Sequence, residues 1–335
     1  MNRPLFLCLV LMFASPGHAV ERPLAIAAQG SFFVGGRDVH SDHLATVPTL
    51  NSKGTITIDQ VYVHYQIPVS AKRRPPVTFI HGCCLTAKSW ETTPDGRMGW
   101  DEYFLRKGFP VYLIDQASRG RSAANPIAIN EVRDGAAAPD SLPQLFSEAH
   151  EAAWVTFRFG PDYPQPFPGL QFPIEAQNEL WKQIVPDLAP SLPTPNPTVA
   201  GLTELSARLK GTVLVSHSQS GIYPFQAAQA SRDGIAAIIA LEPGACPAPD
   251  GDMAPYAGLP VLVVYGDYVE GSPRWGPRLK NCRAFVEAAD KAGGKAELLV
   301  LPEIGIKGNS HLLMQDRNSL QIADILIDWI VKTAL

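Results

Sequence analysis

Residues 212–221 read Thr-Val-Leu-Val-Ser-His-Ser-Gln-Ser-Gly, and an alanine-rich run over 225–230 follows them. An apolar, β-branched strand that bends at a small-x-Ser-x-small sequence into a helix is typical of a nucleophile elbow, where the middle serine is exposed at a sharp turn. That serine is Ser218. Ser216 and Ser220 stand where glycines are usual, so an ordinary strand-to-helix turn with capping serines is the alternative. The rest of the chain decides between the two.

The composition is that of a globular chain with a sizeable core. Of 335 residues, 46% are hydrophobic and 18% are charged, and the formal net charge is -4. The longest basic run, 72–74, gives no electrostatic footprint for nucleic acid or an anionic membrane. We therefore expect a small neutral substrate and no nucleic acid partner.

The N-terminus predicts a signal peptide. Arg3 precedes an apolar run over 5–14, and small residues lead to Ala19, after which we expect cleavage. The apolar run is too short to span a bilayer. We expect a single mature domain over 20–335, periplasmic or secreted and without a stable membrane anchor. An uncleaved N-terminal anchor is the alternative.

Export changes the meaning of the cysteines, because disulfides persist in oxidising compartments. Without Cys8, which lies in the signal peptide, Cys83, Cys84, Cys246 and Cys282 remain and allow three connectivities. We favour Cys83–Cys84, which are adjacent, together with Cys246–Cys282, which lie after one predicted strand and on a later predicted helix.

Short apolar strands alternate with helical segments along the chain. Residues 25–36 and 54–68 are expected to form an antiparallel pair at a sheet edge. Besides the strand that leads into the Ser218 turn, further strands are predicted at 76–80, 109–115, 235–241, 260–265 and 296–301, and helices at 98–107, 174–184, 278–292 and 320–332. This alternation predicts an α/β fold with a mostly parallel sheet and helices on both faces.

Between about 123 and 200 the chain contains thirteen prolines. Proline at this density prevents long regular elements outside 174–184. Aromatic residues in the same stretch, such as Trp154, Phe157 and Trp181, favour a lid that walls a pocket. A plain surface insertion is the alternative.

The carboxyl ends of the strands are where a sheet of this kind gathers functional groups. A serine hydroxyl needs a base, and histidine suits the exchange of its proton. His311 lies in a Gly-Asn-Ser-His run before the last helix, whereas His217 is fixed inside the turn beside Ser218. The order serine, acid, histidine is that of the α/β-hydrolase triad. His311 is therefore the candidate base, and a loop or capping histidine is the alternative.

Two carboxylates compete to hold the imidazole tautomer. Glu242 directly ends one predicted strand, and Asp267 follows Gly266 at the end of the next. The usual spacing after such a glycine would put the acid at Val269. We favour Glu242, whose longer side chain could reach from the neighbouring strand, and expect Asp267 and Asp115 to be structural.

An oxyanion hole needs two preorganised backbone N–H groups. One is expected from Gln219, and the other from the loop after Gly82, hence from Cys83 or Cys84. A disulfide between adjacent cysteines forces the intervening peptide into a costly conformation that tends to persist at functional sites. Two free cysteines packed near the strand end are the alternative.

These motifs together resemble a known family. They are His-Gly-Cys-Cys-Leu-Thr at 81–86, Trp-Glu-Thr-Thr-Pro-Asp-Gly at 90–96, Ser-His-Ser-Gln-Ser-Gly at 216–221 and Gly-Asn-Ser-His at 308–311. They are similar to those of the secreted bacterial α/β-hydrolase esterases related to the Alcaligenes esterase with a vicinal disulfide at its oxyanion hole. The resemblance implies a triad of Ser218, His311 and Glu242, with oxyanion donors from Cys83 and Gln219. It also implies the disulfide pairing favoured above and a candidate homodimer.

We therefore expect a secreted serine carboxylesterase that cleaves small carboxylic esters through an acyl-enzyme. His311 would act as base and then as acid, with no metal or organic cofactor. A lactonase, thioesterase or amidase would use the same residues. A catalytically inactive hydrolase fold that serves as a binding module is the rival from another class.

Overall fold

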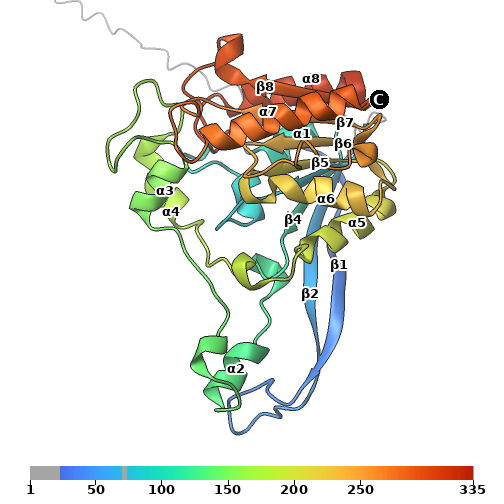
Figure 1. The fold of residues 1–335 in the computed structure, drawn as a ribbon, viewed down its shortest axis with the longest axis vertical. Coiled ribbons are helices and arrows are strands. Elements are labelled where there is room, and N and C mark those ends of the chain that lie inside the picture. Colours follow the sequence, from blue (N-terminus) through green and yellow to red (C-terminus); the bar gives the residue numbers. More distant parts are fainter. Residues whose placement is uncertain (1–22, 70–73, 335) are drawn as a thin grey trace, which may run out of the picture.

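The computed structural model describes residues 23–69 and 74–334, so the predicted signal peptide, with Cys8, lies outside the described residues. Figure 1 shows one sheet with helices packed around it. The strands are β1 (Ile26–Ser41), β2 (Gly54–Pro68), β3 (Val77–Ile80), β4 (Val111–Asp115), β5 (Thr212–His217), β6 (Ile235–Leu241), β7 (Pro260–Tyr265) and β8 (Lys295–Val300). The helices are α1 (Trp100–Arg106), α2 (Ile127–Arg133), α3 (His150–Thr156), α4 (Gln177–Trp181), α5 (Thr198–Leu209), α6 (Tyr223–Ala230), α7 (Gly276–Lys291) and α8 (Ser319–Thr333).

The sheet has the order β1-β2-β4-β3-β5-β6-β7-β8. β2 runs antiparallel to both β1 and β4, and the neighbours from β4 to β8 are parallel. The predicted α/β class, with an antiparallel pair at one edge, is confirmed. β5, which leads to Ser218, lies in the middle of the sheet between β3 and β6.

Both faces of the central strands are buried, because successive side chains of a strand point to opposite sides. Val213 and Val215 of β5 belong to a core completed by α1 and α8. Leu214 belongs to a second core completed by α5, α6 and α7. This two-sided burial explains why β5 reads as a continuous apolar run, and it fixes the turn at its carboxyl end between two packed layers.

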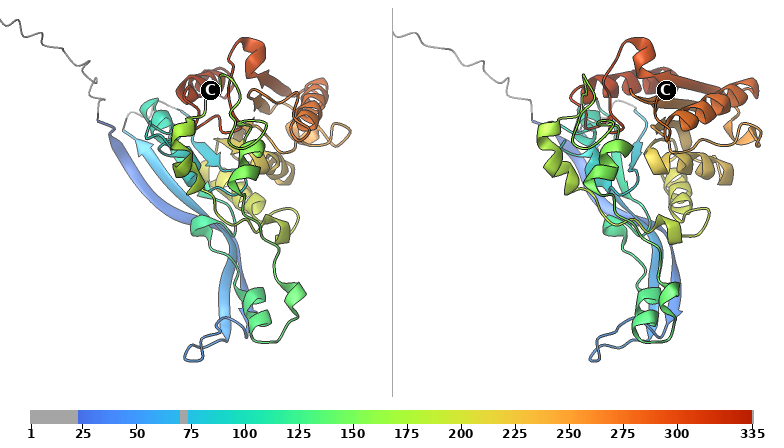
Figure 2. Two further views of the ribbon diagram at one scale, coloured as in Figure 1. Left: turned by 90° about the vertical axis from the view of Figure 1, so that its left-hand side faces the viewer. Right: turned by 60° about the vertical axis from the view of Figure 1, so that its left-hand side comes forward.

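The proline-rich insertion divides into two parts (Figure 2). β1 continues to Ser41, beyond the predicted end, and pairs with β2 in a long hairpin whose far end lies beside α2. There Asn130 Nδ2 donates to the carbonyl of His43 at 2.9 Å. The part with α3 instead contacts the His311 loop, where His311 N donates to the carbonyl of Phe157 at 2.9 Å. The insertion therefore touches both the hairpin and the candidate site.

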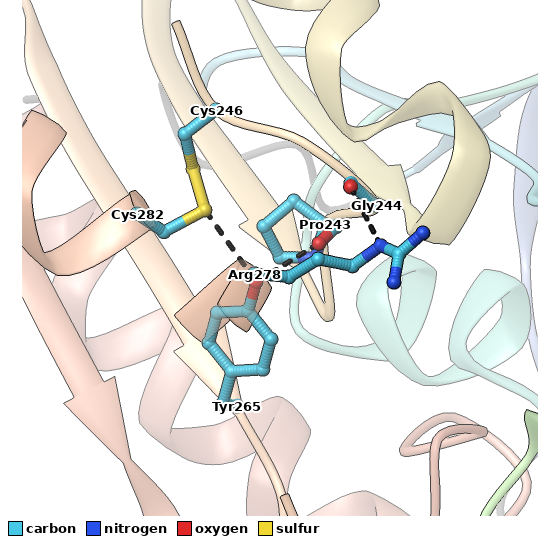
Figure 3. The surroundings of a disulfide bond; sticks show 6 residues. All are labelled: Pro243, Gly244, Cys246, Tyr265, Arg278 and Cys282. Atoms are coloured by element: carbon cyan, nitrogen blue, oxygen red, sulfur yellow. Dashed lines mark hydrogen bonds between the residues drawn. A yellow bond between two sulfur atoms is a disulfide. The ribbon is translucent and has the colours of Figure 1, made fainter. Parts of the chain in front are cut away.

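A disulfide joins Cys246, in the loop after β6, to Cys282 of α7, as predicted (Figure 3). Tyr265 lies against it, and its hydroxyl donates to the carbonyl of Pro243 at 2.9 Å. The loop that begins with Glu242 is thus tied to α7. Across residues 23–69 and 74–334, the helices fall short of the length and apolarity that crossing a membrane requires.

Candidate active site

The turn after β5 holds Ser218 with φ 57°, in the left-handed region that non-glycine residues rarely adopt. Gly82 makes room for it, because a Cβ there would lie 2.6 Å from His217 Nδ1 and 2.9 Å from Ser218 Cβ. Ser220, which replaces the usual glycine, ties the turn together. Its Oγ donates to the carbonyl of Ile80 at 3.1 Å and accepts from His217 N at 3.2 Å. The departure from glycine therefore adds hydrogen bonds to the bend.

Ser218, His311 and Glu242 form a continuous chain of contacts. Ser218 Oγ lies 2.8 Å from His311 Nε2, and His311 Nδ1 lies 3.2 Å from Glu242 Oε2. All three residues are buried. A hydroxyl, an imidazole and a carboxylate in this order can pass the serine proton to the ring while the acid holds the ring in one orientation.

Glu242 has a second set of partners, which the sequence did not reveal. Arg158 Nη2 donates to Glu242 Oε1 at 2.6 Å, and Gly266 N donates to the same oxygen. Arg158 Nη1 also lies 3.4 Å from His311 Nδ1. Arg158 is 2% exposed, so the pair is fully buried, and each charge compensates the cost of burying the other. This arginine comes from the insertion, just after α3.

Asp267, the competing acid, lies in a different hydrogen-bond network. Its Oδ2 accepts from Gly308 N at 2.8 Å, and its Oδ1 accepts from Tyr268 N at 2.7 Å. These bonds brace the loop before His311. Asp115 similarly accepts from Ala87 N at 2.8 Å. The structure thus brings Glu242, and neither aspartate, to the imidazole.

Aromatic rings enclose His311. The ring centroids of Trp275, His217 and Phe157 lie 4.1, 4.7 and 6.0 Å from that of the imidazole. His217 Nε2 also lies 2.8 Å from the carbonyl oxygen of His311. Burial lowers the pKa of His217 to about 3, so this ring is neutral and supports the loop. The sequence-based view that His217 is fixed in the turn agrees with these contacts.

The pKa of His311 lies well below its usual value of 6.5. Burial is the largest cause, followed by the positive charges of Arg158, Arg274 and Arg278. The imidazole is therefore neutral at neutral pH, which is the form that can accept a proton.

The loop that carries Cys83 and Cys84 is held by a buried ion pair between Arg119 and Asp187. Cys84 N points to Asp187 Oδ2 at 3.4 Å, and Gln219 Nε2 donates to the same oxygen at 3.1 Å. Asp187 comes from the insertion and Arg119 from the loop after β4. Their ion pair thus links both predicted oxyanion segments, and Cys84 N already faces a carboxylate of the protein.

The predicted Cys83–Cys84 disulfide is not formed in the structure, where both residues are free thiols. The chain turns at Cys84 with φ 58°, and the two thiols share a hydrogen bond. That bond, and then burial, raise the pKa of Cys83. Among the described residues, these thiols and Glu148 form the only cluster with metal-binding side chains, within 4.8 Å of one another.

Ser218 opens into a cavity of about 300 Å³. Its lining includes Cys83 and Gln219 on one side and Arg274, Trp275 and Arg278 on the other. Phe146 of the insertion also lines it. A larger hollow around Lys88 and Glu179 contains none of these groups. The cavity beside the serine is therefore the candidate substrate site.

The strand order and the serine turn after β5 define an α/β-hydrolase fold. No protein-family profile matches the chain. The solved structure of a bacterial esterase, described as novel, is 58% identical, covers 95% of this chain and 100% of its own, and superimposes with a TM-score of 0.92. A curated relative, the probable secreted lipase phiG of Fungal sp. (strain ATCC 74256), is 27% identical over 328 residues, or 81% of this chain and 86% of the lipase. The chain belongs to the bacterial esterase family and is a carboxylic ester hydrolase.

Proposed function

We propose that the protein is a serine carboxylesterase with a Ser218, His311, Glu242 triad. Ser218 Oγ attacks the ester carbonyl while His311 Nε2 takes its proton, and the imidazolium then protonates the leaving alcohol. Water, activated by the same nitrogen, releases the acid from the acyl-enzyme. The unbroken contacts from Ser218 Oγ to Glu242 Oε2 carry this proposal. No step needs a metal or an organic cofactor.

We further propose that the backbone N–H groups of Cys83 and Gln219 stabilise the oxyanion. Each such donor contributes about 3–4 kcal/mol to the transition state in comparable enzymes. Cys84 is the weaker candidate, because its N–H faces Asp187. The Arg119–Asp187 pair would hold both donor segments in place and is a positioning element.

The insertion over about 123–200 is proposed to act as a partial lid within one mature domain over 20–335. Phe146 in the cavity wall supports this role. The apolar N-terminus, the Cys246–Cys282 disulfide and a relative named a secreted lipase support export. A homodimer remains the proposed assembly from the family resemblance.

Labelling with a fluorophosphonate tests the triad. Intact mass should show one adduct, which peptide mapping places on Ser218, and Ser218→Ala should remove it. His311→Ala should slow labelling strongly while leaving the fold intact by circular dichroism. An unlabelled, folded wild-type protein, under conditions in which a known serine esterase reacts fully, would favour the inactive binding module.

A further inference from the structure

Arg274 and Arg278 line the same cavity as Ser218 and have no ion-pair partner in the part of the chain that the structure describes. Arg278 Nη1 donates to the backbone carbonyl of Arg274, which holds the Arg278 side chain against the segment that carries Arg274. Both guanidinium groups also lie over the ring of Trp275, at 5.8 and 5.2 Å from its centroid. Two positive charges thus line the cavity that contains the candidate nucleophile.

The other arginines at the site are balanced differently. Arg158 and Arg119 are each buried against a carboxylate, Glu242 and Asp187 respectively. A buried positive charge is costly unless an anion offsets it, whereas Arg274 is exposed and Arg278 is half-buried, so both stay solvated and open to an incoming anion. The described residues supply a carboxylate partner for the buried Arg119 and Arg158. They supply none for the two arginines that line the cavity.

Arg278 is held in place from two sides (Figure 3). Its Nε donates to the carbonyl of Gly244 at 3.0 Å, in the loop after Glu242. Cys282, one helical turn further along α7, fixes the helix to the same loop through the disulfide with Cys246. A guanidinium held in this way loses little side-chain freedom when it binds a ligand, which favours a binding role.

The unbalanced charges also affect the chemistry. Burial and then Arg274 lower the pKa of Arg278, since like charges repel. Both arginines also help to lower the pKa of His311. A bound anion would offset them and so restore basicity to the imidazole when substrate is present.

We propose that Arg274 and Arg278 form an anion subsite, and that the preferred ester carries a carboxylate close to the scissile ester group. Guanidinium groups bind carboxylates through paired hydrogen bonds. The inference rests on the proposed function and adds the substrate class to it. It replaces the neutral substrate expected from the net charge, which averages over the whole chain and hides the two cations at the cavity.

Matched substrates test the subsite at low salt. Monomethyl adipate and methyl hexanoate have acyl chains of similar length. The first ends in a carboxylate and the second in a methyl group. 4-Acetoxybenzoate and its methyl ester make the same comparison on the alcohol side. For at least one pair, kcat/KM of the wild type should favour the anion by about tenfold or more, the effect of one charge-assisted contact.

Arg274→Gln and Arg278→Gln should each lower that preference severalfold, and Arg278→Lys should restore part of it. Lys280→Gln removes the same charge from an exposed position of α7 and should leave the preference unchanged. Melting temperatures exclude unfolding as the cause, which matters for Arg278 because it braces Gly244.

The outcomes separate the two proposals. Hydrolysis of the neutral esters with no anion preference, or a preference that neither glutamine variant alters, overturns the subsite and leaves the esterase proposal standing. If no ester is cleaved and Ser218 is not labelled, the proposed function fails. The subsite is then decided by calorimetry with adipate. Binding that Arg274→Gln weakens supports it, and absence of binding overturns it.

Discussion

Replacing Glu242 by glutamine tests whether Glu242 or its rival, Asp267, is the acid of the proposed triad. One carboxylate oxygen faces His311 Nδ1 at 3.2 Å, while the other accepts from Arg158 and from Gly266 N. An amide has a single acceptor oxygen, so it can serve the imidazole or the Arg158 side, but not both. Glu242→Gln must therefore lose either the orientation of the ring or the balance of a buried charge.

We expect kcat/KM of Glu242→Gln to fall by about 10³–10⁴-fold, or roughly 4–5 kcal/mol of transition-state stabilisation. Stability should fall as well, by about 3 kcal/mol, because Arg158 is left buried without its charge partner. Asp267→Asn keeps one acceptor oxygen and has no contact with the imidazole. Its kcat/KM should change by only a few fold, and its melting temperature should fall.

The assay is hydrolysis of a neutral ester at a temperature well below the melting point of both variants, with denaturant unfolding in parallel. Working on folded protein removes the stability difference from the comparison. A large loss in Asp267→Asn together with near-normal kcat/KM in Glu242→Gln would refute the reasoning.

Further predictions concern the residues around the triad. Asp187→Asn should lower kcat/KM by about ten- to a hundredfold, since it frees the segments that carry the proposed oxyanion donors. Asp140→Ala removes a carboxylate from an exposed position and should have no such effect. Equal losses in the two variants would contradict the role of Asp187. In a pH profile, kcat/KM should stay level from pH 8 to below 6.5 and decline only at lower pH. The neutral imidazole is the active form, and burial together with the neighbouring arginines holds the pKa of His311 well below 6.5. A fall in kcat/KM that begins above pH 7 as the pH is lowered would contradict this low pKa. Exported protein unfolded without reductant should show two thiols, from Cys83 and Cys84, on titration with a disulfide reagent. A count of zero would mean that the vicinal disulfide forms after all, and kcat/KM of the Cys83→Ala, Cys84→Ala double variant would then measure its catalytic role.

The parts of the fold that the sequence predicted well are those with local signals. β6 and β7 have the predicted bounds, because uninterrupted apolar runs bounded by turns define buried strands. Ser218 and His311 follow strands in short motifs, so their neighbourhood could be inferred from topology alone. α5, in contrast, was not predicted: its first turn falls at the end of the proline-rich insertion, and no element was expected between about 200 and 212.

The residues that the sequence did not reveal depend on distant contacts. Arg158 and Asp187 lie in the proline-rich insertion, where no periodic pattern surrounds them. Arg158 is 84 positions from its partner Glu242 (242 − 158), and Asp187 is 68 positions from its partner Arg119 (187 − 119). A lone charged residue is usually solvated, so only the folded chain identifies the ones that balance a buried charge.

The contact between Asp187 and Arg119 has a consequence for protein engineering. Caps of hydrolases are attractive segments to exchange, because they shape the pocket while the catalytic residues sit on the sheet. Here the insertion also supplies the carboxylate that neutralises Arg119 beneath the Cys84 and Gln219 segments. A chimera that received a foreign segment without an equivalent carboxylate would inherit an unpaired buried arginine beside the candidate active site. The insertion of this enzyme is therefore not an interchangeable module.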